Sequence, residues 1–519
     1  MLLKFYLNDM NFINITNHQS VPLSSIPELN YSSFFQTNTE LIENHPERHC
    51  VLYFGCRENK SVRLICCIAD DNDHDIKVSS SVVKDDSVLS SFSARILSFE
   101  KFEREIHENF GVKYSDHPWL KPVRYAENRA DKSLTIANYP FFNIDSEELH
   151  EVGVGPVHAG IIEPGHFRFL CNGEQILHLE IQLGYQHRGL EQLFLTKTKL
   201  IQRTTLAESI AGDSAVGHTT AFAYLLESMS EVKPDREILF CRTLAQELER
   251  IAVHTGDLSA ICTDIAYQLG SAVFGRLRTP LINFFQEWCG NRLAKGLIRA
   301  GYNPFPFNKP LADRLITILD AFEPDFIEMN NELSRLPTSL SRFERTGMLS
   351  YDQLLRIGTV GMSARMNTLI RDIRISHPYG LYSQFKHEPV IKHHGDVYSR
   401  VQVRKQEVLQ SIGYIRQLLN QIPQLQQQSQ PQPQPQPQPQ SQPVTLSVDS
   451  FGISLTEGWR GEICHACITG HNGEMLIYKI KDPSFHNWLA LALAVRNNEI
   501  SDFPVSNKSF DLSYCGHDL

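Results

Sequence analysis

The sequence predicts an α+β fold in which a small N-terminal α/β domain is followed by a larger domain with a helical bundle core and peripheral β-sheets. Two observations predict this class. Residues 1–120 hold β-rich runs and one amphipathic helix, whereas the middle of the chain holds four long stretches with apolar residues at helical spacing. With 519 residues, 42% of them hydrophobic, the chain is long enough for at least two domains.

A hairpin and a helix define the N-terminal unit. Residues 50–56 (CVLYFGC) and 61–70 (SVRLICCIAD) flank the polar segment RENK, a pattern typical of two antiparallel strands. Residues 98–111 (SFEKFEREIHENFG) carry apolar side chains at spacings of three and four and end in glycine, which favours a helix that stops there. We assign residues 1–127 to this domain and the polar, irregular residues 128–152 to a linker.

The second domain is expected over residues 153–519. It begins with strand-like segments in which Asn172-Gly173 forms a two-residue turn. Residues 424–443 form a disordered Pro/Gln insert, because alternating proline removes backbone donors and favours an extended, solvated spacer. Strands and a helix return after it. The stretches expected to be helical are 206–228, 235–269, 271–301 and 312–336.

The net charge argues against nucleic acid as a partner, and the hydropathy argues against a membrane-spanning segment or a signal peptide. A net charge of -10 supplies no basic surface for a phosphate backbone, so nucleic acid is excluded as a partner. No segment reaches the roughly 18 to 20 consecutive apolar residues that cross a bilayer, and the N-terminus lacks the pattern of a signal peptide. We therefore expect a cytoplasmic chain.

The cysteines predict neither a disulfide framework nor a metal site. Eleven of them occur at irregular spacings, which is typical of reduced, buried thiols. The one CxxC pair, Cys464 and Cys467, lies in a segment whose alternation favours a strand. Because side chains three positions apart on a strand point to opposite faces, this pair is a poor metal-binding motif.

Several ordered motifs resemble the large subunit of group 4 nickel-iron hydrogenases, the energy-converting, formate-hydrogenlyase type, and the homologous quinone-site subunit of respiratory complex I. The N-terminal unit is similar to the 30-kDa-like accessory subunit of complex I through FEREIHENFGVKYSDHP (102–118). The resemblance covers nearly the whole chain and implies a hydrogenase-large-subunit-like fold. It is carried by GPVHAGIIEPGHFRF (155–169), LGYQHRGLEQLF (183–194), LAQELERIAVHTGDL (244–258), GNRLAKGLIRAG (290–301), GDVYSRVQVRKQEVLQSI (395–412) and EGWRGEICH (457–465).

The resemblance places four metal-binding cysteines of hydrogenases at positions where this chain has other residues. They align with Ala211, Ser214, Ser513 and Gly516. Alanine and glycine have no ligating side-chain atom, and a serine hydroxyl is a hard ligand where low-valent nickel and iron need soft thiolates. We therefore expect no nickel-iron centre and no other metal bound by this chain.

The complex I side of the resemblance implies quinone as an acceptor. The tyrosine and histidine that are expected to protonate the reduced ring align with Gly212 and close to Pro164. The usual pair of proton donors is therefore missing, and no cofactor is assigned to this chain itself.

A polar shell survives around these positions. The resemblance aligns Glu163 with a proton-transferring glutamate and Arg460 with an arginine above the metal, while His218 follows the lost cysteine motif; we expect these three to handle protons. The alternatives are that Arg460 and Glu462 form a buried ion pair between two sheets and that His218 is a core histidine. The expected walls of the cavity and of the partner interface are His158, His187, Arg188, Glu462 and His465.

The sequence therefore leads to two hypotheses. The first is a subunit of an electron-transfer complex that receives electrons from a partner iron-sulfur subunit and couples to proton or ion translocation through antiporter-like membrane subunits. It would lie in the cytoplasm, peripheral to the inner face of the membrane. The second is a non-catalytic structural or coupling subunit of the same complex. A third hypothesis, the weakest, is an active hydrogenase with unusual metal ligands. It requires that the purified protein contain stoichiometric nickel.

Overall fold

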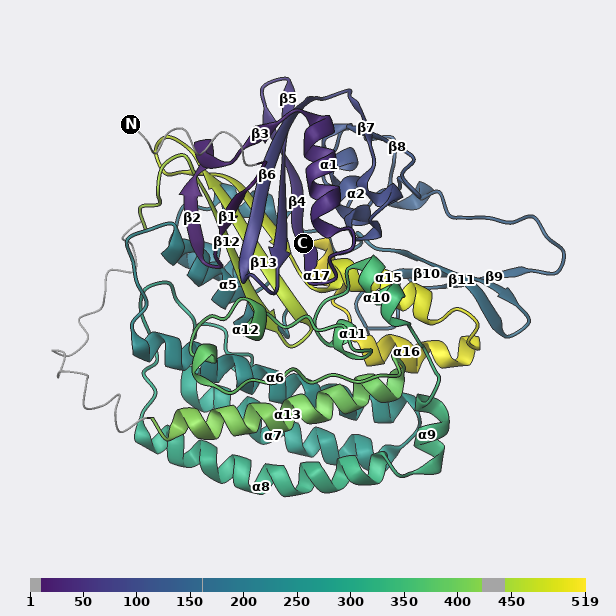
Figure 1. Cartoon of the computed structure of the whole chain (residues 1–519). Coiled ribbons are helices and arrows are strands. Elements are labelled where there is room, and N and C mark those ends of the chain that lie inside the picture. Colours follow the sequence, from purple (N-terminus) through teal and green to yellow (C-terminus); the bar gives the residue numbers. More distant parts are fainter. Residues whose placement is uncertain (1–10, 161, 422–443) are drawn as a thin grey trace.

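The fold is α+β, as the sequence predicts: sheets occupy one side of the molecule and a bundle of long helices the other (Figure 1). The computed structural model describes residues 11–160, 162–421 and 444–519. The predicted Pro/Gln insert at 424–443 lies outside these residues. Within them, no helix is long and apolar enough to cross a membrane.

The N-terminal sheet has the strand order β1-β6-β5-β4, and β3 pairs in parallel with β6 on the same edge as β1, farther along the strand. The predicted hairpin and helix are confirmed. Asn59, with φ 56°, makes the turn between β4 and β5, and Gly111, with φ 78°, ends α2. The bounds in this unit are β1 (Ile13–Ile15), β3 (Glu28–Leu29), α1 (Tyr31–Ile42), β4 (Arg48–Glu58), β5 (Ser61–Asp70), β6 (Asp75–Lys84), β7 (Val88–Ser90), α2 (Glu100–Phe110) and β8 (Lys113–Ser115).

A three-stranded antiparallel sheet follows, made of β9 (His150–Val154), β10 (His166–Asn172) and β11 (Gln175–Gln182). Strand β9 begins inside the segment expected to be a linker. The predicted turn is wrong by one residue, because Asn172 pairs with Gln175 and the loop consists of Gly173 and Glu174. Gly173 adopts φ 56°, which a residue with a Cβ rarely does.

Four long helices, α6, α7, α8 and α13, lie side by side and form the bundle (Figure 1). The expected helix at 206–228 is interrupted, since residues 208–214 form a loop, and the expected helix at 271–301 ends at Cys289, before Gly290 with φ 78°. The bounds are α3 (Leu190–Thr196), α4 (Leu200–Ala207), α5 (Ala215–Ser228), α6 (Arg236–Asp264), α7 (Gln268–Cys289), α8 (Lys309–Leu333), α9 (Pro337–Phe343), α10 (Tyr351–Ile357), α11 (Met362–Arg365), α12 (Ile373–Ser376) and α13 (Val397–Leu419).

The C-terminal segment returns to the centre of the molecule. Strands β14, β13 and β12 are joined by β2, from the N-terminal region, in one antiparallel sheet, which we call the C-terminal sheet. Every residue of β12 and β13 is buried, and α5 covers one face of this pair. The two ends of the sequence are therefore joined in one sheet. The bounds are β2 (Gln19–Pro22), β12 (Ser450–Gly458), β13 (Gly461–Thr469), β14 (Met475–Lys481), α15 (Ser484–Ala494), α16 (Phe503–Phe510) and α17 (Tyr514–Asp518).

Candidate functional site

The loop at residues 208–214 and the first turn of α5 form one side of the candidate site. The carboxyl group of Glu249, on α6, accepts from the N–H groups of Val216 and Gly217 at 2.8 and 3.2 Å. Burial outweighs these two bonds and raises the pKa of Glu249 to about 8. This buried carboxyl group fixes the N-terminus of α5 and with it the position of His218.

His218 lies in a buried chain of hydrogen bonds that joins α5 to the C-terminal sheet. Its Nε2 lies 3.0 Å from Asp482 Oδ2, and its Nδ1 lies 3.1 Å from His465 Nε2. The second ring nitrogen of His465 lies 2.7 Å from the hydroxyl of Tyr478. Four titratable side chains are thus connected in the order Tyr478, His465, His218, Asp482.

Burial and neighbouring groups shift the pKa values of Asp482 and His465 in this hydrogen-bonded series. Burial alone would raise the pKa of Asp482, but the hydrogen bond from His218 and the charge of Arg460 lower it to about 2, so the carboxylate only accepts. Burial and the neighbouring His218 hold the pKa of His465 well below its usual range. Because the carboxylate only accepts, Nε2–H of His218 donates to it. The neutral ring of His465 has one donor and one acceptor nitrogen for its two neighbours, His218 and Tyr478.

Arg460 joins the loop at 208–214 to Asp511, close to the end of the sequence. Its two terminal nitrogens form a bidentate pair with Asp213, both distances being 2.7 Å, and one of them also donates to Ser214 Oγ at 3.2 Å. Its Nε donates to the carbonyl of Asp511 at 2.5 Å. The guanidinium lies over the ring of Trp459, 3.8 Å from its centroid. Burial would lower the pKa of Arg460, but the Asp213 carboxylate raises it.

The expected alternative for Arg460, an ion pair with Glu462, is wrong. Glu462 instead accepts from Lys481 on β14 and lies 2.7 Å from Nε2 of His49, which belongs to β4 of the N-terminal sheet. The reason is geometric: Arg460 lies in the β12–β13 turn and Glu462 lies in strand β13, so the two side chains face different neighbours. Glu462 therefore joins the N-terminal and C-terminal sheets.

The four positions aligned with hydrogenase cysteines meet at the same place. Ser214 precedes α5 and contacts Arg460, while Ser513 Oγ accepts from the N–H of Gly516 at 2.9 Å and caps α17. A Cβ added at Gly516 would lie 2.7 Å from the carboxyl group of Asp482. Ala211 is buried. The residues present offer no thiolate, and Asp482 fills the space beside position 516, so this set does not fit a nickel-iron centre.

The three residues expected to handle protons converge on the C-terminal segment 511–516. Half-buried Glu163 accepts from the N–H of Cys515 at 3.2 Å. Arg460 binds the backbone of Asp511, and His218 binds the carboxylate that packs against Gly516. Burial and the nearby Glu163 raise the pKa of the Cys515 thiol to about 12, so this cysteine stays protonated.

The remaining residues of the expected wall hold loops and the C-terminal segment. A ring nitrogen of His158 lies 2.8 Å from the carbonyl of Gly165 and closes the loop before β10. A ring nitrogen of His187 lies 2.8 Å from the carbonyl of Asp518. The exposed guanidinium of Arg188 donates to the carbonyls of Ser209, Ile210 and Cys515 at 2.6, 2.9 and 3.0 Å.

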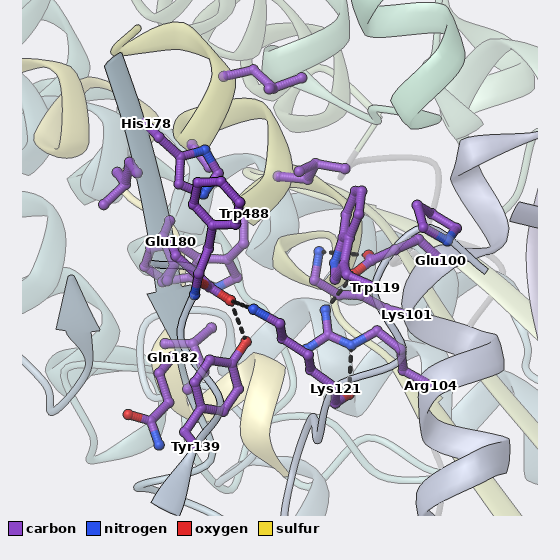
Figure 2. Close-up of a pocket in the computed structure, with 18 of the residues that line it drawn as sticks. Glu100, Lys101, Arg104, Trp119, Lys121, Tyr139, His178, Glu180, Gln182 and Trp488 are labelled. Atoms are coloured by element: carbon purple, nitrogen blue, oxygen red, sulfur yellow. Dashed lines mark hydrogen bonds and ion pairs between the residues drawn. The ribbon is translucent and has the colours of Figure 1, made fainter. Parts of the chain in front are cut away.

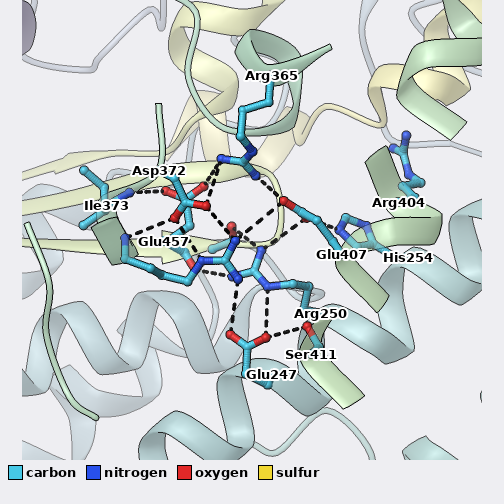
Figure 3. A network of polar contacts seen from close by, with 12 residues as sticks. Glu247, Arg250, His254, Arg365, Asp372, Ile373, Arg404, Glu407, Ser411 and Glu457 are labelled. Atoms are coloured by element: carbon cyan, nitrogen blue, oxygen red, sulfur yellow. Dashed lines mark hydrogen bonds and ion pairs between the residues drawn. The ribbon is translucent and has the colours of Figure 1, made fainter. Parts of the chain in front are cut away.

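A buried network of charges joins helices α6, α11 and α13 to strand β12 (Figure 3). Arg365 pairs with Glu407 and, at 2.9 Å, with Glu457; a ring nitrogen of His254 lies 2.8 Å from the other oxygen of Glu407. The network approaches the site through Asp257, which hydrogen-bonds Asp511 and accepts from Arg404. Burial and the charge of Asp257 raise the pKa of Asp511 to about 7. Members seen in Figure 3 are Glu247, Arg250, His254, Arg365, Asp372, Arg404, Glu407, Ser411 and Glu457.

Sequence reasoning missed the partners that complete the site. Asp213 lies inside the aligned motif SIAGDSAVGH and is the acidic residue nearest to Ser214, so its position was a usable signal. Asp482 follows a strand in KIKDPSFHN, where an acidic residue next to proline is typical of any turn. Only the packing of α5 against the C-terminal sheet distinguishes it.

Comparisons with known proteins identify two family models that match parts of the chain. Residues 269–518 match the family model "Respiratory-chain NADH dehydrogenase, 49 Kd subunit", and residues 33–131 match "Respiratory-chain NADH dehydrogenase, 30 Kd subunit". The chain is 28% identical to the "Carbon monoxide-induced hydrogenase" of Rhodospirillum rubrum, over 70% of this chain and 97% of that protein.

Two further relatives represent the two sides of the resemblance. The "Hydrogenase-4 component G" of Escherichia coli is 25% identical over 77% of this chain and 67% of its own length. An NADH-quinone oxidoreductase protein of Phocaeicola vulgatus is 24% identical over 62% of this chain and 68% of its own length. The chain therefore joins a domain of the 49-kDa type and a domain of the 30-kDa type of respiratory-chain NADH dehydrogenase in one polypeptide, and it is similar to both hydrogenase subunits and NADH-quinone oxidoreductase subunits.

Proposed function

We propose that the chain is the subunit of a membrane-associated complex that receives electrons from a partner iron-sulfur subunit, carries no nickel-iron centre and couples electron transfer to proton or ion translocation. One observation supports this proposal most: Glu163 and Arg460, from distant parts of the chain, both bond segment 511–516, and His218 bonds Asp482, which lies beside Gly516 of that segment. A carboxylate, an imidazole and a fixed cation in one place suit proton handling.

The chain of hydrogen bonds through His218 gives this role a physical route. If the two imidazoles each pass one proton along, the hydroxyl of Tyr478 and the carboxylate of Asp482 become linked without movement of the backbone. The carboxylate, with a pKa of about 2, accepts a proton only when the charge nearby changes. Such a site responds to the arrival of an electron on a neighbouring subunit by moving a proton.

The proposed partners are an iron-sulfur small subunit and antiporter-like membrane subunits, and the proposed location is the cytoplasmic face of the membrane. Relatives named as a membrane-bound hydrogenase subunit and as NADH-quinone oxidoreductase subunits support this assignment. We expect the chain to co-purify with membrane subunits after mild extraction. Recovery as a stable soluble monomer would contradict the assignment.

Restoring thiols at the four aligned positions should not restore nickel. We expect a variant with Ala211→Cys, Ser214→Cys, Ser513→Cys and Gly516→Cys to unfold more easily, because a Cβ at position 516 collides with the carboxyl group of Asp482. Elemental analysis of the purified variant and of the native chain measures nickel, and urea unfolding measures stability. The matched control keeps Gly516 and changes only the other three positions; one nickel per chain in the native protein would revive the hydrogenase reading.

The isosteric change Glu163→Gln tests the proton-handling role. Its amide oxygen can still accept from the Cys515 N–H, so the fold is kept while the titratable group is lost. We expect electron flux through the assembled complex to fall at least about a hundredfold, the lower end of what one general acid or base contributes. Flux is measured in membranes, assembly by co-purification, and Glu388→Gln, at an exposed surface position, is the control.

The second candidate function is that of a structural or coupling subunit without chemistry of its own. It is favoured by the bonding of Arg460, whose guanidinium nitrogens all donate to this chain itself. Under this reading, Glu163→Gln leaves both assembly and flux unchanged. The same variant therefore separates the two functions.

A further inference from the structure

A cavity of about 880 Å³ lies apart from the site around Arg460. It is bounded by α2, the segment at 118–123, strand β11 and helix α15 (Figure 2). None of Glu163, His218 and Arg460 lines it. Its volume is within the range of roughly 300–1,000 Å³ that small-molecule sites occupy.

The walls of the cavity are mainly apolar. Leu179 and Ile181 from β11 face it, with Leu493 from α15 and the indoles of Trp119 and Trp488. Exposed apolar surface of this extent is stabilised when an apolar body covers it. The walls therefore suit an acyl chain or a flat hydrocarbon.

Positive charge exceeds negative charge around the cavity. Four cations line it (Lys101, Arg104, Lys121 and Arg496) against the carboxylates Glu100 and Glu180, which leaves an excess of two. Both carboxylates are already bonded. Glu180 accepts from Lys121, from the Tyr139 hydroxyl at 3.1 Å and from the Phe142 N–H at 2.7 Å, as Figure 2 shows in part.

Two polar groups in the wall lack a strong partner. Lys101 has its one ion-pair contact at 3.5 Å, with Glu100, which also accepts from Arg104 and from the indole of Trp119. His517 is 2% exposed and bonds Asp518 through Nδ1, but its Nε2 is buried with no hydrogen-bond partner. Leaving a buried polar atom unpartnered is unfavourable, so a ligand that bonds it would be favoured.

We propose that this cavity binds an amphipathic anion, whose apolar body lies against the leucines and tryptophans and whose carboxylate or phosphate head lies toward Lys101 and His517. The excess positive charge selects the anion. Nε2 of His517 accepts from the remaining P–OH of a singly protonated phosphate, and for a carboxylate it takes up one proton from solution together with the anion and then donates to it. The inference is independent of electron transfer through the complex.

Fluorescence titration of the full-length chain tests this proposal, because Trp119 and Trp488 line the cavity. We expect the probe 8-anilinonaphthalene-1-sulfonate to bind one saturable site. Palmitate and hexadecyl phosphate should both displace it, and hexadecanol, with the same chain but no charge, should do so at least tenfold less well. Displacement by only one of the two anions identifies the head group.

Two variants and their matched controls locate the site. Lys101→Gln should weaken palmitate binding at least tenfold without affecting hexadecanol, and Leu493→Trp should fill the cavity and weaken every ligand. Lys386→Gln, whose side chain is 91% exposed, and Leu476→Trp, which is 49% exposed, should bind as the native chain does. Circular dichroism confirms folding; if Lys101→Gln unfolds, Leu493→Trp decides the question.

Three outcomes would overturn the proposal. These are the absence of saturable binding, equal affinity in the native chain and in folded Leu493→Trp, and binding by the isolated chain but not by the assembled complex. The last result would show that a neighbouring subunit fills the cavity. None of these outcomes bears on flux in Glu163→Gln, so the proposed function is tested separately.

Discussion

Replacing Arg365 by alanine is expected to lower the free energy of unfolding by about 3–5 kcal/mol, the cost of breaking a buried ion pair by removing one partner. Arg365 is fully buried on α11, and its guanidinium pairs with Glu407 and Glu457. Alanine would leave both carboxylates in the interior without this cation.

The two carboxyl groups differ in how readily they take up a proton. Burial and the charge of Asp372 raise the pKa of Glu457 to about 7, so this group can be protonated near neutral pH, whereas Glu407 cannot. Burial would raise the pKa of Glu407, but the charge of Arg365 and the hydrogen bond from His254 hold it well below its usual range. The folded pKa of this carboxyl group is thus lower than the unfolded pKa, so its contribution is present above the unfolded pKa and lost as the pH falls through the folded pKa. Acid should therefore weaken the native chain more than Arg365→Ala.

Urea unfolding at pH 7 measures the effect, and Arg416→Ala is the matched control. Arg416 also binds two carboxylates, those of Asp320 and Glu323, but its side chain is 35% exposed. Exposed pairs contribute about 0–1 kcal/mol, so the control should unfold nearly as the native chain does. Equal stability of the two variants would contradict a stabilising role for the buried network.

Gly361→Ala should lower the free energy of unfolding by a similar amount, because this glycine allows its own backbone to touch the backbone of the β12–β13 turn. Gly361 has φ 64° and ψ -142°, a conformation that residues with a Cβ rarely adopt. A Cβ there would lie 2.2 Å from the carbonyl oxygen of Arg460 and 2.2 Å from Cα of Gly461. The β12–β13 turn would have to move, and Arg460 would move away from Asp213.

We expect this substitution to cost at least about 3 kcal/mol, through strain at a special backbone conformation and displacement of a buried turn. Thermal unfolding measures the loss. Gly212→Ala is the control, since its φ lies outside the left-handed region and no atom lies within 4 Å of its added Cβ. If Gly361→Ala melts at the native temperature, the close approach does not constrain the turn.

Local signals in the sequence were sufficient for elements whose geometry is set by near neighbours. The β4–β5 hairpin and helix α2 are confirmed, because alternation, helical spacing and a terminating glycine act within a few residues. The same signals failed at 206–228. Apolar spacing continues through that stretch, yet Gly212 and Asp213 form a loop whose conformation is stabilised by Arg460, almost 250 positions later.

The candidate site was predictable in part. Motifs that resemble a known family identified Glu163, His218 and Arg460. In the structure Glu163 and Arg460 bond segment 511–516, and His218 bonds Asp482 beside it. Their chemical roles stay predictions. The pairing of Arg460 with Glu462 was wrong because adjacent positions around a hairpin turn do not determine which side chains meet.

The sequence by itself determined the α+β class, the local hairpin and helix, the family and the residue types at the four aligned positions. Tertiary structure alone decided that Asp482 receives the hydrogen bond of His218, that Asp213 holds Arg460, and that Glu462 binds His49 of the N-terminal sheet. The physical reason is that a buried charge must find a partner wherever packing brings one within reach, and packing joins segments hundreds of residues apart.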